Sequence, residues 1–177
     1  MGGLRCVDGS YLSVTPVVCT DSVGMPYEVT LALHRDGSPY GTVGERCGWF
    51  LARLARGVDE ARRSGDWPDP EDRFPDDEPD SELFCFRYRS RSGRMGGGEL
   101  RCHLRTIPIW VPTGEWRLTR RAYVEAWGSQ GAGLRAVLTS SELADFVHGL
   151  VEEAEGCLGG RDLARNPIEG AGSRHSR

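Results

Sequence analysis

The chain has 177 residues, of which 38% are hydrophobic and 27% charged, so it can bury a core and form one domain. Its longest apolar run, residues 107–111, is too short to cross a membrane, and no secretory signal is visible, so we expect a cytoplasmic protein without membrane contact. The net charge of −4 argues against a globally basic nucleic-acid binder.

The N-terminal third predicts two strands and a helix. Residues 11–19 form the first strand, in which Pro16 suits only an edge position. Residues 27–34 alternate apolar and polar side chains, which is typical of a strand with one buried face. Asp36 and Gly37, followed by Ser38 and Pro39, predict a turn. Residues 44–63 follow a 3.6-residue apolar period and predict an amphipathic helix.

A strongly acidic segment follows this helix. Residues 66–82 contain nine acidic residues, one arginine and four prolines, which gives a net charge of −8 and leaves +4 on the rest of the chain. Proline excludes regular structure there, and the like charges repel one another. We therefore expect an exposed loop.

A predicted hairpin with one apolar and one basic face comes next. In residues 84–91 and 100–105, apolar side chains alternate with arginine, and four glycines, three of them consecutive, lie between the two runs. The predicted basic face includes Arg87, Arg89, Arg101, His103 and Arg105. It suits phosphates, RNA or an acidic protein. The alternative is a solvated face, or one that the acidic segment neutralises. All 22 lysine or arginine positions are arginine, a bias typical of proteins encoded by GC-rich genomes. A cluster of arginines is therefore weaker evidence for a binding site than usual.

The segment after the hairpin combines apolar side chains with proline. Pro108 and Pro112 bracket Ile109 and Trp110, and Trp116 follows shortly. Proline at these positions excludes a central strand, so the segment is an edge strand or a protruding loop. Tryptophan is enriched at interface hot spots, so Ile109, Trp110 and Trp116 are candidate partner-binding residues. The alternative is a loop that folds Trp110 onto the sheet.

The C-terminal third predicts further strands and a second helix. Residues 116–127 form a strand or a pair of strands, and residues 133–138 form another. Thr139 and Glu142 make a capping box, and apolar side chains then recur on one face of a helix that ends at Gly156. Residues 159–177 are poor in apolar side chains and predict a disordered tail.

Together these elements predict an α+β protein. Their order is two strands, a helix, four strands and a helix, with an antiparallel sheet of about five to six strands packed against two amphipathic helices. Residues 1–158 form a single domain that includes the acidic loop at 66–82, and the tail lies outside it.

Catalytic and metal-binding motifs are scarce. The six cysteines and four histidines are scattered, without the paired spacing of a zinc site, so we expect no metal and mostly buried free thiols. The chain has no nucleophile-elbow, zinc-protease or dinucleotide-binding motif, and without lysine it excludes Schiff-base chemistry. We expect no cofactor, and no catalytic residue can be named.

Two short segments resemble the SsgA-like sporulation and cell-division proteins of actinobacteria. Residues 26–29, P-Y-E-V, are similar to a strand of that family, and residues 49–53, W-F-L-A-R, are similar to the start of a helix in it. Residues 133–154 are compatible with its C-terminal strand and helix. The resemblance implies a small, non-enzymatic α+β protein that acts through protein partners.

Three hypotheses about function follow. The first is a binding or regulatory protein without catalytic activity, such as an immunity-type protein, that acts through a protein partner or also associates with itself. The second is a small biosynthetic enzyme with a pocket between the sheet and the helices. The third is a nucleic-acid binder that uses the arginine face, which the acidic net charge disfavours. A deep cleft with converging polar groups favours the enzyme, and a flat sheet favours the binder.

Overall fold

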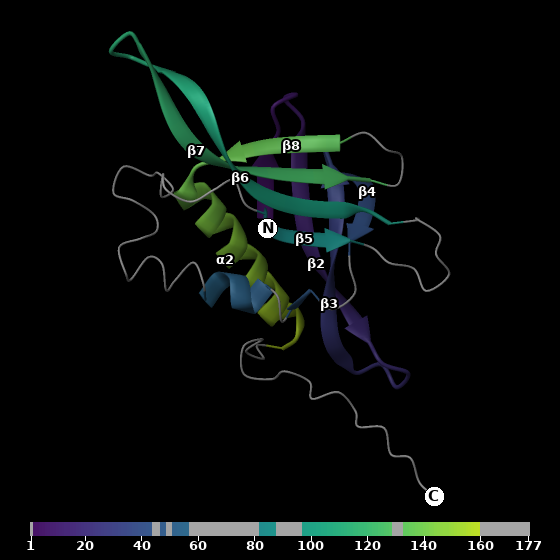
Figure 1. Ribbon diagram of the computed structural model, residues 1–177. Helices are drawn as coiled ribbons and strands as arrows, with labels where there is room; N and C mark the ends of the chain where they lie inside the picture. Colours follow the sequence, from purple (N-terminus) through teal and green to yellow (C-terminus); the bar gives the residue numbers. More distant parts are fainter. Residues whose placement is uncertain are drawn as a thin grey trace, which may run out of the picture.

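Figure 1 shows the computed structural model of the chain. It describes residues 2–43, 47–48, 51–56, 82–87, 97–128 and 133–159. Within these residues, eight strands form two antiparallel sheets, one in the order β1-β2-β3-β4 and the other in the order β5-β6-β7-β8. The strands of the two sheets run across one another, and helix α2 lies beside them (Figure 1).

The first sheet contains β1 (Gly2–Arg5), β2 (Tyr11–Thr20), β3 (Pro26–Arg35) and β4 (Ser38–Val43). Asp36 and Gly37 join β3 to β4 with φ values of 50° and 78°, the positive values that a two-residue Asp-Gly hairpin turn needs. The prediction that Pro16 takes an edge position is confirmed, because β1 pairs with β2 only from Tyr11 to Val14.

The second sheet contains β5 (Glu82–Arg87), β6 (Glu99–Val111), β7 (Glu115–Trp127) and β8 (Gly133–Leu138). β5 pairs with β6 only as far as His103, and β8 pairs with β7 only from Ala122 onwards. Residues 105–121 therefore extend beyond both neighbouring strands as a two-stranded ribbon. We call this ribbon the arm, and Figure 1 shows it projecting from the body of the molecule.

Helix α2 (Ser140–Cys157) begins at the predicted capping box, which is confirmed. The Thr139 hydroxyl accepts a hydrogen bond from the Glu142 N–H at 3.3 Å, and the Glu142 carboxylate accepts one from the Thr139 N–H at 2.8 Å. Within the helix predicted at 44–63, the residues described as helical are 48 and 51–56, and the remainder of that prediction is outside the described residues.

The core lies between the two sheets and α2. Leu33 of β3, Leu100 of β6 and Leu150 of α2 belong to one cluster of buried side chains. The sheets approach closely at Gly98, whose N–H donates to the Thr42 carbonyl at 2.8 Å. A Cβ at Gly98 would lie 2.8 Å from the Trp127 carbonyl oxygen, so only glycine fits this junction.

The predicted α+β class is confirmed, but the single sheet of five to six strands is wrong, because the strands form two sheets of four. No sequence pattern predicted β1 or β4, and Ser38 and Pro39, expected in the turn, begin β4. Residues 116–127 lie in one strand rather than a pair. Most of the acidic segment, residues 66–81, and the tail from 160 onwards are outside the described residues.

Candidate functional site

The arm is closed by a turn that its own residues favour. The Val111 carbonyl accepts a hydrogen bond from the Gly114 N–H at 2.9 Å, Pro112 suits the second position of such a turn, and Gly114 has a φ of 84°. Three-residue loops of this kind are common in hairpins. Pro108 is tolerated inside β6 because the strand has β7 as its one pairing neighbour there.

One face of the arm is apolar and exposed. Trp110 pairs with Trp116 and Pro108 pairs with Leu118, so the four side chains share a face. The two indole rings meet edge to face, with centroids 5.4 Å apart. Trp110 is 59% exposed, Trp116 69% and Leu118 67%. Trp110 therefore does not fold back onto the sheet, which was one of the alternatives that the sequence left open.

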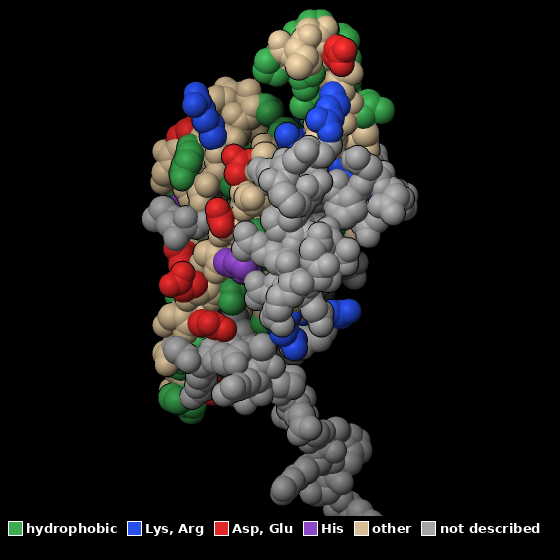
Figure 2. Space-filling model, turned by 90° about the vertical axis from the view of Figure 1, so that its left-hand side faces the viewer, with side chains coloured by type: hydrophobic (Ala, Val, Ile, Leu, Met, Phe, Trp, Pro, Cys, Tyr) green, Lys and Arg blue, Asp and Glu red, His purple; other side chains and the backbone are tan. Residues whose placement is uncertain are grey.

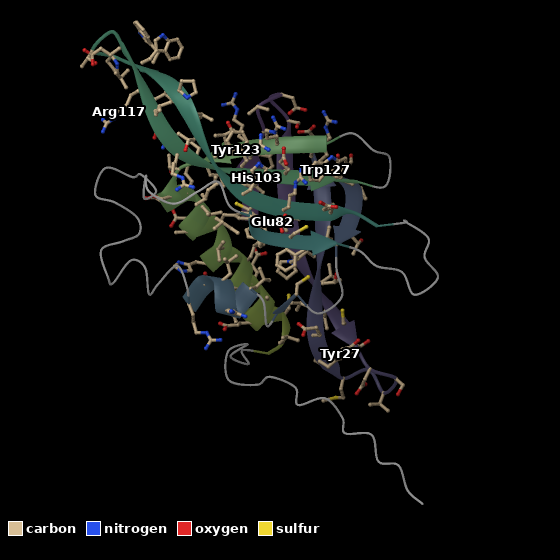
Figure 3. The ribbon with its side chains drawn as sticks, viewed as in Figure 1. Tyr27, Glu82, His103, Arg117, Tyr123 and Trp127 are labelled. Carbon is tan, nitrogen blue, oxygen red and sulfur yellow. The ribbon has the colours of Figure 1, made fainter. Side chains whose placement is uncertain are left out.

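The base of the arm is more enclosed than its tip. Thr119 and Arg120 are buried there, whereas Arg117, closer to the turn, is exposed (Figure 3). The same two strands then enter the sheet, where their inward side chains join the core. The exposed apolar face thus belongs to the outer part of a hairpin whose base is anchored in the body.

A cluster of charged and aromatic side chains covers the outer face of the second sheet. At its centre, Glu125 accepts hydrogen bonds from Arg101 Nε and Nη2 at 2.9 and 2.8 Å and from Arg135 Nε at 2.8 Å. The Glu125 side chain is only 3% exposed. Burial alone raises the pKa of Glu125, but the hydrogen bonds and charges of the two arginines outweigh it and hold that pKa below 4.5.

His103 lies at the edge of this cluster, and its ring stacks on Tyr123 with centroids 5.7 Å apart (Figure 3). Its Nδ1 is 3.8 Å from Glu125 Oε2, and its Nε2 is buried without a hydrogen-bond partner. Burial, together with the charge of Arg105, lowers the pKa of His103 below 6.5, although Glu125 acts in the opposite direction. His103 is therefore mainly neutral at pH 7.

The arginines of this face are engaged within the chain. The Arg101 guanidinium lies over the Trp127 ring at 4.4 Å, and those of Arg105 and Arg135 each lie 5.7 Å from the centroid of Tyr123. Arg101 and Arg135 are also paired with Glu125. The positive charge of these arginines is therefore neutralised in part by Glu125, a carboxylate on the same sheet.

The predicted site residues gather in two adjoining parts of one hairpin. Ile109, Trp110 and Trp116 lie in the arm, and Arg101 and His103 lie in the outer-face cluster. Arg105 joins the two, because its backbone starts the arm and its guanidinium lies over Tyr123. Arg87 pairs with Glu99 through the strand ladder, and Arg89 is outside the described residues.

Four residues of the outer-face cluster were not predicted. They are Tyr123, Glu125, Trp127 and Arg135. The sequence contains a hint of this cluster. Glu125 is an acid in an arginine-rich part of the chain, and it lies two residues from each of two aromatic residues, so the three side chains point to the same face of the strand. What the sequence lacked was the register that puts Glu125 directly between Arg101 and Arg135.

A surface cleft of about 570 Å³ lies between β1, β8 and the first half of α2. Its lining includes the apolar side chains of Leu4 and Phe146 together with the carboxylates of Glu142 and Asp145. Burial raises the pKa of the Cys6 thiol, which also lines the cleft, so this thiol is protonated and a poor nucleophile. Glu142 is occupied by the capping box. The described lining therefore lacks a nucleophile paired with a base.

All six cysteines lie in described parts of the chain, and each is a thiol rather than half of a disulfide. Burial raises the pKa of Cys47 to about 12 and raises that of Cys102 still further. In the described segments, no group of three His, Cys, Asp or Glu side chains is arranged to hold a metal ion. No helix within them has the length and apolarity needed to cross a membrane. Comparison with protein-family models, curated proteins and solved structures finds no match for this chain.

Proposed function

We propose that this chain is a cytoplasmic binding or regulatory protein without catalytic activity, and that it docks to a protein partner through the arm. The observation that carries the proposal is the pair Trp110 and Trp116, more than half exposed on a hairpin that projects from the body. Large apolar patches on a protein surface mark interaction sites, and tryptophan is the residue type most enriched among hot spots.

The pairing of its two strands makes the arm a preformed element for docking. Seven residue pairs from Arg105–Arg121 to Val111–Glu115 hold its two strands in register, and the turn at Gly114 closes them. A preformed binding surface loses little conformational entropy on association, so more of its contact energy appears as affinity. A loop of the same composition would first have to be ordered by the partner.

The chemistry of the described side chains favours a binder over an enzyme. Glu125 is held by two arginines, which keep it ionised and leave it a poor general base for His103. The cleft beside α2 offers a protonated thiol and a carboxylate that already caps the helix. The SsgA-like resemblance, which implies a non-enzymatic protein acting through protein partners, supports the same proposal and extends it to a regulatory role in actinobacteria.

Photo-crosslinking tests the proposal directly. A photoreactive residue at Leu118, beside the two tryptophans, should give an adduct with a discrete protein in cells that express the chain. The same residue at Val23, which is 78% exposed in the β2–β3 turn, serves as the matched control and should give none. Adding Trp110→Ala should suppress the Leu118 adduct. An adduct that is absent at Leu118, or that is unaffected by Trp110→Ala, would contradict the proposal.

A further inference from the structure

The exposed side of α2 is strongly acidic. The helix carries Glu142, Asp145, Glu152, Glu153 and Glu155 and no arginine or lysine. Asp145 and Glu152 are exposed, and the buried stripe of the helix faces the core on its opposite side. Figure 2, which views the molecule from the side of α2, shows acidic side chains spread along this face.

The arm has the opposite charge. Residues 105–121 contain four arginines and one glutamate, a net charge of +3. Of these residues, Arg120 is buried at the base of the arm and Glu115 lies beside the turn. Figures 1 and 2 both show the arm projecting beyond the body, so its tip points away from the α2 of its own molecule. The two surfaces are complementary, but the fold keeps the arm tip from reaching the acidic face within one copy.

The acidic face also borders a partly apolar cleft. The cleft between β1, β8 and α2 has a volume of about 570 Å³, with Leu4, Cys6 and Phe146 among its lining residues and Asp145 on its α2 side. This volume is in the range of pockets that enclose drug-sized apolar groups. The cleft also holds Arg5 of β1, but the two carboxylates on α2, Glu142 and Asp145, outnumber it. A basic arm with an apolar tip therefore has a partly apolar, net acidic site on the same protein.

We infer that the partner of the arm includes a second copy of this chain, whose α2 cleft and acidic face receive the apolar tip at Trp110 and Trp116. This inference rests on the proposed docking role of the arm. Pairing of two arms through their apolar faces would bring two basic ribbons together, and like-charge repulsion opposes it. The contact joins two different patches, so copies associate by reciprocal exchange of arms or by closing into a ring.

The test uses two variants that damage opposite sides of this contact. Trp110→Ser alters the arm, and Asp145→Arg alters the cleft and its charge. Val23→Ser is the control for loss of an exposed apolar side chain. Glu82→Arg, at an exposed position on β5, is the control for the change in net charge. Both contact variants should unfold at the temperature of the unaltered protein, because the altered side chains are exposed.

Sedimentation of the full chain from about 1 to 200 μM should show concentration-dependent association. Each contact variant should weaken this association at least about 30-fold, as the loss of a hot spot does, and the controls should leave it unchanged. Raising the salt concentration should weaken it as well.

Mixing the two variants is the decisive measurement. Trp110→Ser retains an intact cleft and Asp145→Arg retains an intact arm, so the mixture regains one complete contact and should associate, while each variant alone does not. Association of the unaltered chain without rescue in the mixture would overturn the arm-to-cleft contact. A chain that stays monomeric throughout, yet crosslinks from Leu118 to a different protein, would overturn this inference and leave the proposed function standing. If the chain neither associates with itself nor crosslinks from Leu118 to another protein, both this inference and the proposed function are wrong.

Discussion

The two halves of the β6–β7 hairpin share one continuous ladder and yet differ in the burial of the apolar side chains on one face. In the body half, Leu104 lies opposite Ala122, and both are almost fully buried. In the arm half, Leu118 lies opposite Pro108 on the same face by register, and Leu118 is 67% exposed. Alternation therefore decides which side chains share a face, whereas the packing of other elements decides whether that face is covered.

This difference separates two roles for the same residue types. Apolar side chains of the body half stabilise the fold by leaving water. Those of the arm tip remain in water in the free protein, so they contribute to binding once a partner covers them. Substitutions in the two halves should consequently affect different measurable quantities.

The matched pair Leu104→Ala and Leu118→Ala should separate the two halves most strongly. Leu104 is 1% exposed, so its truncation removes buried methyl groups and opens a cavity, which should lower the free energy of unfolding by about 2 to 5 kcal/mol. Leu118→Ala should change it by less than about 0.5 kcal/mol, as exposed substitutions do. Urea unfolding monitored by circular dichroism checks both values, and equal losses would contradict the division into body and arm.

An intermediate effect is expected for Glu125→Gln. The variant loses the charge that holds Arg101 and Arg135, and because water can still reach both guanidinium groups, the expected loss is about 1 to 2 kcal/mol. The pKa of Glu125 is lower in the folded chain than its ordinary 4.5, so its contribution is present above pH 4.5 and is lost as the pH falls through the folded value. The difference between the two proteins should therefore shrink in acid, which unfolding curves at pH 7 and pH 3 can measure.

A smaller, pH-dependent effect is expected at His103. Its pKa is lowered on folding, so the unfolded chain binds the proton more readily and stability falls as the pH drops through 6.5. His103→Gln removes this contribution, so stability of the variant should depend less on pH between about 7 and 5 than that of the unaltered chain. A larger dependence in the variant would show that protonated His103 stabilises the cluster.

Much of the fold could be predicted because its signals are local. The capping box at Thr139, the alternation of residues 27–34 and the edge position of Pro16 all depend on neighbours in the chain. The Asp36–Gly37 turn was predicted, but its consequence, a hairpin with β4 beginning at Ser38, was not. β1 has only four residues, too few for a periodic signal. The division into two sheets depends on pairing between distant segments, which no local pattern specifies.

The candidate site shows the same limit. Proline and tryptophan around Trp110 pointed to an edge or a protrusion, and the structure shows a ribbon with an exposed tip. The arginine alternation pointed to a basic face but not to Glu125, whose position between Arg101 and Arg135 follows from the register of three strands. To predict from sequence that Glu125 neutralises these two arginines, one would need to know which residues pair across the three strands.

For nucleic acid we expect almost no binding. Arg101 and Arg135 are paired with Glu125 and the whole chain is acidic, so a generic single-stranded oligonucleotide should not bind appreciably at about 150 mM salt. Fluorescence anisotropy with a labelled oligonucleotide checks this. Micromolar or tighter binding, with a salt slope of roughly −0.7 to −0.9 per phosphate contact that flattens in Arg101→Ala, would favour the nucleic-acid hypothesis instead.

If the tip of the arm serves association and contributes little to the fold, Trp110→Ala should separate these two roles when stability and association are measured on the same sample. We expect the free energy of unfolding of the monomer to stay within about 0.5 kcal/mol of that of the unaltered chain. We also expect association with the partner, whether a second copy or a crosslinked protein, to be weaker by about 2 kcal/mol or more. A monomer destabilised by several kcal/mol with unchanged association would contradict this division of roles and make Trp110 part of the core.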